Sequence, residues 1–187
     1  MIKKVFLIVG LAGCFAFAAE AAEPLPEKSL YHFKQVWKNQ YGKKVALESL
    51  RGRVRVVAMI YTQCKGACPL IVNTLKRIEK KLPAAGFNKP GFVLFSMDPK
   101  RDSPKVLKKF AKMFQLQKER WQLLTSDESN VQELATALDF SFKESPNGMF
   151  VHQNTIFVLD SNGVLIGQYM NLDEAVDGVE KELSRLS

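Results

Sequence analysis

The sequence predicts an α/β fold in which helices cover both faces of a mixed sheet. Three patterns support this prediction: a short hairpin near residues 36–47, alternating strands and helices over 54–138, and a closing hairpin with a terminal helix. Alternating strands and helices favour parallel strands, whereas hairpins add antiparallel ones. The length of the chain suits one domain with a sizeable core.

Glycine turns define the first elements. Gly42 lies between the apolar stretches 36–37 and 45–47, which predicts a short β-hairpin. Gly52 then turns the chain into the β-branched, mostly apolar run 54–61, which is typical of a buried strand. This run is expected to be a central strand of the sheet.

Helical periodicity follows this strand. Apolar residues recur at helical spacing over 70–82, so an amphipathic helix is expected there, with Pro83 and Gly86 ending it. The later elements are expected to be a buried strand over 91–97, a helix over 104–114, a short strand over 121–124, a helix over 126–138, strands over 155–159 and 164–167, and a helix over 172–186. This order is that of a thioredoxin-like architecture with an N-terminal β-hairpin and insertions.

Turn and cap residues support these boundaries. Ser161-Asn162-Gly163 is a strong hairpin signal between the last two strands. Ser126 or Asp127 is expected to cap the helix that follows it, and Asp102 to act near the start of the helix over 104–114. Asp98 is expected to occupy an ordinary strand-to-turn exit, so neither aspartate is assigned to a hard metal site.

Residues 1–21 are interpreted as a secretory signal peptide, which leaves residues 22–187 as the thioredoxin-like domain. The apolar stretch 5–19 is shorter than the roughly 20 residues of a membrane-spanning helix. The alternative is a lipoprotein signal that ends before Cys14, which would be lipidated and anchor the protein. Soluble export to the periplasm is favoured because apolar residues continue past Cys14.

The chain carries a formal net charge of +8. Its basic residues are spread along predicted helix faces and lack interleaved aromatic residues, so a solvated surface is favoured over nucleic-acid binding. Export would place the mature chain in an oxidising compartment, where a disulfide can persist.

Two cysteines carry the strongest chemical signal. Cys64 and Cys68 are separated by three residues and lie where the strand pattern gives way to the helical one, with Pro69 suited to the first helical turn. A helix N-terminus stabilises thiolates. A structural disulfide is the simplest interpretation of such a pair, but the strand-to-helix turn favours redox chemistry or metal binding.

His152 is the candidate third ligand. It precedes the strand expected over 155–159, and the loop entering that strand faces the cysteine turn in a thioredoxin-like sheet. A hydrogen-bonded histidine without a ligand role is an equal alternative from the residues alone, and His32 is expected to be inert. Two thiolates and an imidazole suit copper, as Cu(I) or Cu(II), whereas structural zinc normally takes a fourth protein ligand. Met149 is a weaker copper candidate.

The sequence resembles the Sco/SenC family of copper-binding proteins of cytochrome c oxidase assembly. The segments that carry the resemblance are 41–43 with 50–52, the cysteine motif 61–69, the stretch 96–104 and His152 before the final hairpin. The resemblance implies a thioredoxin-like fold and copper ligands at Cys64, Cys68 and His152. The chain departs from the family pattern at Lys65, where a proline is frequent, and at Val151, where an acidic residue is frequent.

These observations favour an exported copper metallochaperone whose partner is a copper-accepting oxidase subunit, associated with a membrane. The alternative is a thiol–disulfide oxidoreductase in which Cys64 and Cys68 form a redox-active pair that reduces client cysteines. A peroxidase on the same scaffold is a weaker alternative, because the chain has a close cysteine pair in place of a lone peroxidatic cysteine.

Overall fold

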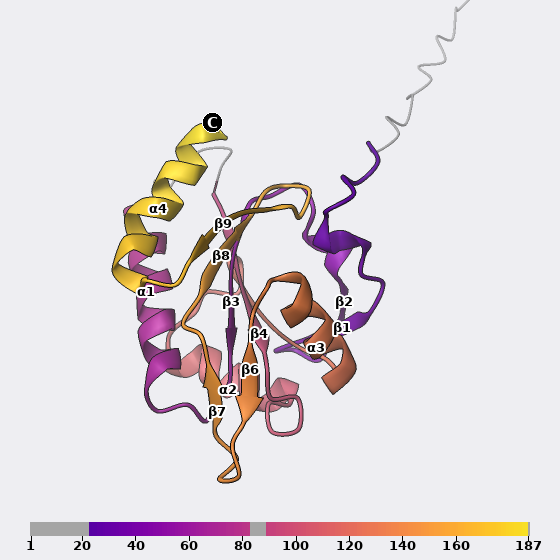
Figure 1. Cartoon of the computed structure of the whole chain (residues 1–187), viewed down its shortest axis with the longest axis vertical. Helices are drawn as coiled ribbons and strands as arrows, with labels where there is room; N and C mark the ends of the chain where they lie inside the picture. The colour runs from indigo at the N-terminus through magenta and orange to yellow at the C-terminus, as the bar shows by residue number, and fades with distance from the viewer. Residues whose placement is uncertain (1–22, 83–88, 187) are drawn as a thin grey trace, which may run out of the picture.

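A seven-stranded sheet forms the centre of the protein (Figure 1). The structure is a computed structural model that describes residues 23–82 and 89–186. The strand order is β2-β1-β5-β4-β3-β8-β9, with β1 at Val36–Asn39, β2 at Lys44–Ala46, β3 at Arg55–Ile60, β4 at Gly91–Ser96, β5 at Trp121–Thr125, β8 at Ile156–Leu159 and β9 at Leu165–Tyr169.

The sheet is mixed, as predicted. Strands β3, β4 and β5 run parallel, β8 is antiparallel to β3, and β9 is antiparallel to β8. The hairpin β1–β2 joins the other side through an antiparallel pairing of β1 with β5. The carboxyl ends of β3 and β4 therefore lie at the same edge of the sheet as the amino end of β8.

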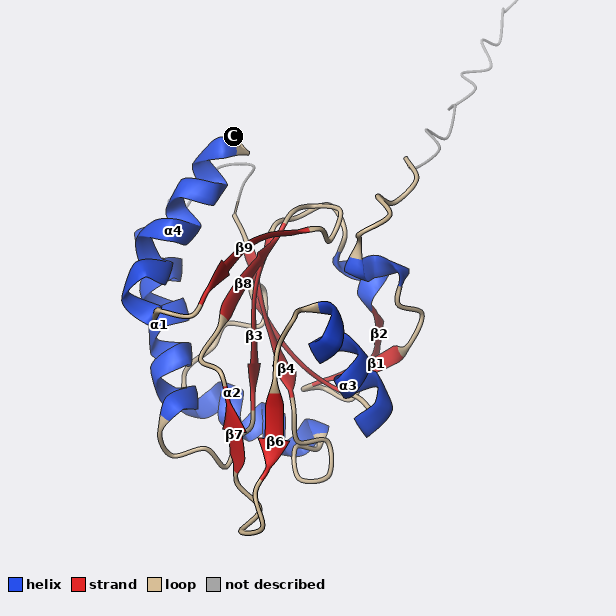
Figure 2. Ribbon diagram, viewed as in Figure 1, coloured by secondary structure: helices blue, strands red, loops and turns tan. Residues whose placement is uncertain are grey.

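Helices cover both faces, which confirms the thioredoxin-like arrangement (Figure 2). They are α1 at Ala67–Lys81, α2 at Pro104–Met113, α3 at Glu128–Ala137 and α4 at Leu172–Arg185, with short 3-10 helices at Leu30–His32 and Leu47–Leu50. Helix α1 packs against α4, and Lys76 of α1 donates to the Phe114 carbonyl at the end of α2. Helix α3 lies on the opposite face, in front of the sheet in Figure 1.

The core lies on both sides of the central strands. Every residue of β4 and β8 is buried, and only Arg55 of β3 is partly exposed. Phe92 stacks on Trp121 with ring centroids 4.5 Å apart. Burying a large apolar side chain stabilises a fold by about 1.5–3 kcal/mol, so these strands hold the segment that follows Ile60 in a fixed position.

A second, two-stranded sheet was not predicted. Strand β6, Phe142–Glu144, pairs antiparallel with β7, Phe150–His152, and Phe142 lies opposite His152. His152 therefore ends a strand of its own and does not lie in a plain loop before β8. Strands of three residues are too short to give a periodic sequence pattern.

Several boundaries differ from the prediction. Helix α1 begins at Ala67, so Pro69 lies in its first turn as predicted, and Cys68 also lies in that turn and not in the preceding loop. The closing hairpin is confirmed, with Gly163 at φ +82° in its turn. Pro83, Gly86, the predicted signal peptide and Cys14 lie outside the described residues. No helix within 23–82 and 89–186 is long and apolar enough to cross a membrane.

Candidate metal centre

Cys64, Cys68 and His152 meet at the edge of the main sheet. Their ligand atoms, two sulfurs and one ring nitrogen, all lie within 4.8 Å of one another. Cys64 follows β3, Cys68 lies in the first turn of α1, and His152 is the last residue of β7. Residues 84 positions apart in the chain thus form one cluster, with 4.0 Å between Cys68 Sγ and His152 Nε2.

The two thiols have different electrostatic surroundings. Burial alone would raise the pKa of the Cys64 thiol, but hydrogen bonds from the backbone N–H groups of Cys68 and Gly66, together with those from the Cys68 and Tyr61 side chains, outweigh it and hold that pKa below its ordinary value. The Cys68 N–H lies 3.4 Å from Cys64 Sγ. Burial raises the pKa of the Cys68 thiol well above its usual range, and Cys64 adds to this rise.

The expectation that the helix N-terminus stabilises a thiolate therefore holds for Cys64. It is wrong for Cys68, because the side chain is completely buried and the helix start cannot offset its desolvation. Both cysteines are free thiols. Cys64 is the thiol that ionises first and remains partly accessible.

The imidazole of His152 is oriented by its neighbours. Its Nδ1 lies 2.7 Å from the Gln153 carbonyl, which leaves Nε2 toward the sulfurs. The Tyr61 ring packs edge-on against it at 5.9 Å between centroids, and the Phe140 ring lies at 6.1 Å. A backbone partner on one ring nitrogen is the usual way in which proteins orient a metal-binding histidine.

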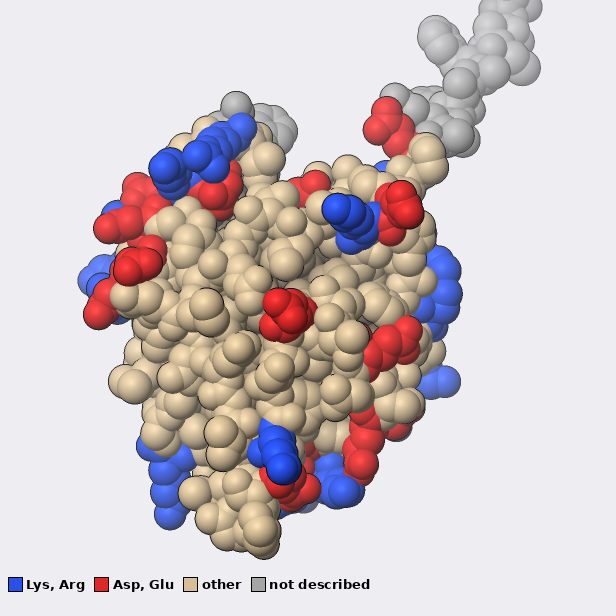
Figure 3. All heavy atoms as spheres, viewed as in Figure 1, with Lys and Arg blue, Asp and Glu red and all other residues tan. Residues whose placement is uncertain are grey.

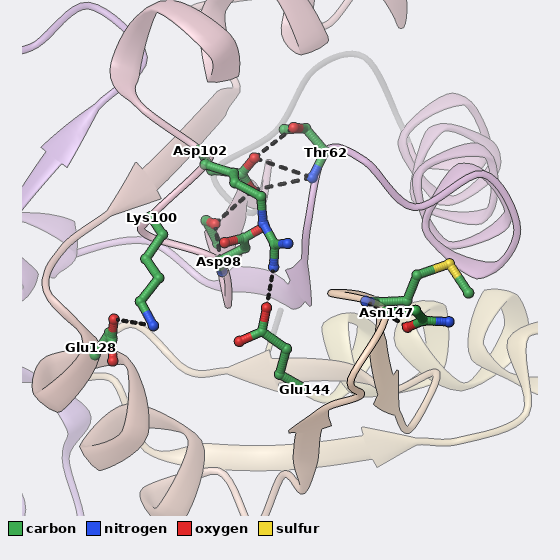
Figure 4. Close-up of polar contacts among 10 residues, drawn as sticks. Thr62, Asp98, Lys100, Asp102, Glu128, Glu144 and Asn147 are labelled. Atoms are coloured by element: carbon green, nitrogen blue, oxygen red, sulfur yellow. Dashed lines mark hydrogen bonds and ion pairs between the residues drawn. The ribbon is translucent and has the colours of Figure 1, made fainter.

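Asp102 supports the cysteine loop, and its predicted role at the helix start is wrong. Ser103 is the N-cap residue of α2, whereas the Asp102 carboxylate accepts hydrogen bonds from the Thr62 N–H at 3.1 Å, the Thr62 hydroxyl at 2.5 Å and the Ser96 hydroxyl at 2.7 Å (Figure 4). It is completely buried. Burial raises the pKa of Asp102, and the hydrogen bonds from Ser96 and Thr62 offset part of this effect.

Other candidate residues lie away from the cluster or are exposed. His32 is in the 3-10 helix at Leu30–His32, where its Nε2 lies 2.9 Å from the Pro26 carbonyl. Met149 precedes β7 and is 57% exposed. Lys65 is exposed, and Asp98 is buried against Arg101.

The donor set has a definite chemical preference. Two sulfurs and one imidazole nitrogen are soft or borderline ligands, which suit copper and do not suit hard cations such as Mg²⁺ or Ca²⁺. A structural zinc site would normally need a fourth protein ligand. Within the described residues, this is the one group of three or more Cys, His, Asp or Glu side chains with metal-binding spacing.

Most charged side chains on the face seen in Figure 3 lie near its margin, where lysine and arginine are interspersed with aspartate and glutamate. One acidic group lies near the centre, within a broad area of other residues. Basic residues on this face are therefore dispersed.

Comparison with known proteins gives a family match over almost the whole described chain. A model of the SCO1/SenC family matches residues 26–186. The chain is 32% identical over 140 residues to the SCO1 protein homolog of Bacillus subtilis (strain 168), an alignment that covers 73% of this chain and 72% of that protein.

Solved structures of Sco proteins have the same fold as this chain. BsSco, described as a member of the Sco family of cytochrome c oxidase assembly proteins with a disulfide switch, is 31% identical, with a TM-score of 0.68 over 80% of this chain and 88% of that one. Arabidopsis thaliana ScoI, solved with copper bound, has a TM-score of 0.72 over 81% of this chain and 96% of that one. At 19% identity, the second likeness shows a shared fold.

Proposed function

The chain belongs to the SCO1/SenC family, and on this premise we propose that it is an exported copper metallochaperone. It holds copper through Cys64, Cys68 and His152 and delivers it to a copper-accepting subunit during cytochrome c oxidase assembly. Copper is the cargo of this activity. The client is membrane-associated, and the protein acts in the periplasm, either released or anchored through a lipidated Cys14.

The convergence of two sulfurs and one imidazole nitrogen carries the proposal. A span of 4.8 Å allows all three atoms to approach one ion after small side-chain movements. Cu(I) accepts few soft ligands, and Cu(II) gains from the nitrogen. The half-buried position of Cys64 and His152 supports transfer, because a client's ligands can reach the ion from the solvent side.

A second function is supported by the lowered pKa of Cys64. A partly accessible thiolate beside a second thiol can reduce a client disulfide. Cys64 would attack a client sulfur and form a mixed disulfide, and Cys68, after losing its proton, would attack Cys64. The client would leave as a dithiol with two electrons from the pair, which would become the Cys64–Cys68 disulfide.

His152→Ala separates the two functions. The complete copper site, above all for Cu(II), needs the imidazole, whereas disulfide exchange needs only the sulfurs. We expect this variant to weaken Cu(II) binding by about a hundredfold, or about 2.8 kcal/mol, and Cu(I) binding much less. The variant should still cycle between dithiol and disulfide, which thiol alkylation and mass spectrometry would measure.

The decisive assay is oxidase assembly in a host that lacks its own copy. His32→Ala is the matched control, because His32 is exposed and contacts the Pro26 carbonyl. The metallochaperone proposal predicts that His32→Ala supports assembly and His152→Ala does not. Full rescue by His152→Ala, with its loss of Cu(II) affinity confirmed, would exclude copper delivery through the three-ligand site and leave thiol reduction.

A further inference from the structure

Arg101 connects the loop after β4 to the hairpin that carries His152. Its Nε is bonded to a carboxylate oxygen of Asp98, and its Nη2 lies 2.8 Å from Glu144 Oε1 on β6. Its guanidinium carbon lies 5.5 Å from the centroid of the Phe150 ring on β7. One side chain thus contacts both strands of the hairpin, and Figure 4 shows Glu144 facing this loop.

The Asp98 end of this connection is fixed. The Asp98 side chain is 1% exposed, and the backbone N–H of Asp98 donates to the Ser96 hydroxyl at 3.0 Å. The Arg101 side chain is 29% exposed and the Glu144 side chain 41%. An arginine held by a buried carboxylate keeps its remaining donors in a defined direction, because the guanidinium is planar.

Gly148 places the turn of the hairpin directly beside the Arg101 guanidinium. A Cβ atom at position 148 would lie 2.8 Å from Arg101 Nη1, closer than side chains normally approach. Gly148 also has φ +76°, which the turn between β6 and β7 requires. The turn thus leaves room for the guanidinium.

The hairpin needs such a contact because β6 and β7 form a sheet separate from the main one. Its place is set by side chains, among which Phe150 meets Tyr61 at 5.2 Å between ring centroids, while Phe150 and Phe142 pack within the hairpin at 5.8 Å. In the hairpin register, Glu144 lies opposite Phe150, and Phe142 lies opposite His152 two residues along each strand. Arg101 therefore acts two residues away from the imidazole.

We propose that Arg101 is a positioning residue that holds the β6–β7 hairpin, and through it the His152 imidazole, against the two cysteine sulfurs. This inference rests on the proposed copper site. Arg101 would support the half of the site that contains His152, and Asp102 supports the half that contains the two cysteines. The same loop, residues 97–103 between β4 and α2, thus supports both halves.

Lys100 offers a matched control. It lies in the same loop, but its ion pair of 3.0 Å is with Glu128 of α3, whereas Arg101 pairs with Glu144 of β6. Both partners are more than half exposed, at 65% and 63%. Such exposed pairs contribute little to stability, so Lys100→Met removes a charge from the loop without releasing the hairpin.

The test compares Arg101→Met, Arg101→Lys and Lys100→Met with the wild-type full chain. Copper itself is the probe: Cu(I) and Cu(II) affinities are measured separately, and the nitrogen hyperfine coupling of Cu(II) reports the imidazole. We expect Arg101→Met to weaken Cu(II) binding about tenfold, within the range found for groups that orient metal ligands, and to reduce the nitrogen coupling. Cu(I) affinity should stay within about threefold of the wild type.

The control variants should distinguish the loss of the contact with the hairpin from the loss of a positive charge in the loop. Lys100→Met should match the wild type, and Arg101→Lys should recover part of the nitrogen coupling because it keeps the charge near Glu144. Glu144→Ala, which breaks only the hairpin end of the contact, should act in the same direction, and combining it with Arg101→Met should add little.

Three results would overturn the inference. Arg101→Met could match Lys100→Met in Cu(II) affinity and nitrogen coupling. It could instead weaken Cu(I) and Cu(II) binding equally, which would indicate an effect on the whole fold. If the wild-type protein binds no copper, this inference fails together with the proposed function, whereas the first two results leave the proposed function standing.

Discussion

The cysteine half and the histidine half of the site are held in different ways. Cys64 and Cys68 flank the junction of β3 with α1, where β3 is paired on both sides and α1 buries six side chains. His152 ends a three-residue strand that pairs only with β6 and has no completely buried residue. The comparison indicates that the sulfurs form the fixed part of the site and the imidazole the adjustable part.

This difference has a chemical consequence for copper. The fixed sulfurs are sufficient for Cu(I), while Cu(II) depends also on the nitrogen of the more loosely held half. A change of copper oxidation state would thus mainly alter the bond between the ion and His152 of the hairpin. In the proposed copper delivery, handover to a client would begin at the hairpin without disturbing the core.

The largest expected effect comes from breaking the cysteine half. Cys64→Ser or Cys68→Ser leaves one thiolate and one imidazole, so each should weaken Cu(I) and Cu(II) binding by more than about a hundredfold, or about 2.8 kcal/mol. Competition titration with a chromophoric copper chelator would measure this under anaerobic conditions. Undiminished affinity in either variant would exclude the site.

The two halves also differ in how well the sequence predicted them. The run 54–61 and the helical spacing after it placed both cysteines at a strand–helix junction, because long apolar patterns identify buried elements. The parallel and antiparallel strands of the main sheet were predicted for the same reason.

The sequence did not predict the contacts that hold the site residues in place. Strands β6 and β7 are three residues each, and their packing depends on contacts between distant residues, such as Arg101 with Glu144. Asp102 was assigned to the helix start because it directly precedes Ser103-Pro104, but its side chain turns back to Thr62. Local pattern identifies a cap, whereas only the tertiary structure shows that Thr62 lies within reach.

A smaller effect is expected from Asp102, which supports the cysteine half of the site: it should make the stability of the protein depend on pH. Burial raises the pKa of Asp102 in the folded protein, so the folded state binds this proton more tightly than the unfolded state. The ordinary pKa of this carboxyl is 3.8. The contribution of Asp102 to the free energy of unfolding therefore falls as the pH rises from 3.8 through the higher pKa of the folded state. Asp102→Asn should not show this fall, so the wild type should lose stability relative to it over that interval.

Asp127→Asn is a control of opposite sign. The hydrogen bond from the Asn130 N–H lowers the pKa of Asp127, so its stabilisation is present above 3.8 and is lost as pH falls. Urea unfolding of the three proteins at a series of pH values would measure both differences. Equal slopes for Asp102→Asn and Asp127→Asn would contradict the buried, ionisable role given to Asp102.

X-ray absorption at the copper edge of the copper-loaded, reduced protein tests most directly the claim that both halves hold one ion. One copper per chain is predicted, with two sulfur ligands and one imidazole nitrogen, and His152→Ala should remove the nitrogen while keeping both sulfurs. A shell without sulfur, or one that survives replacement of both Cys64 and Cys68 by serine, would contradict the account.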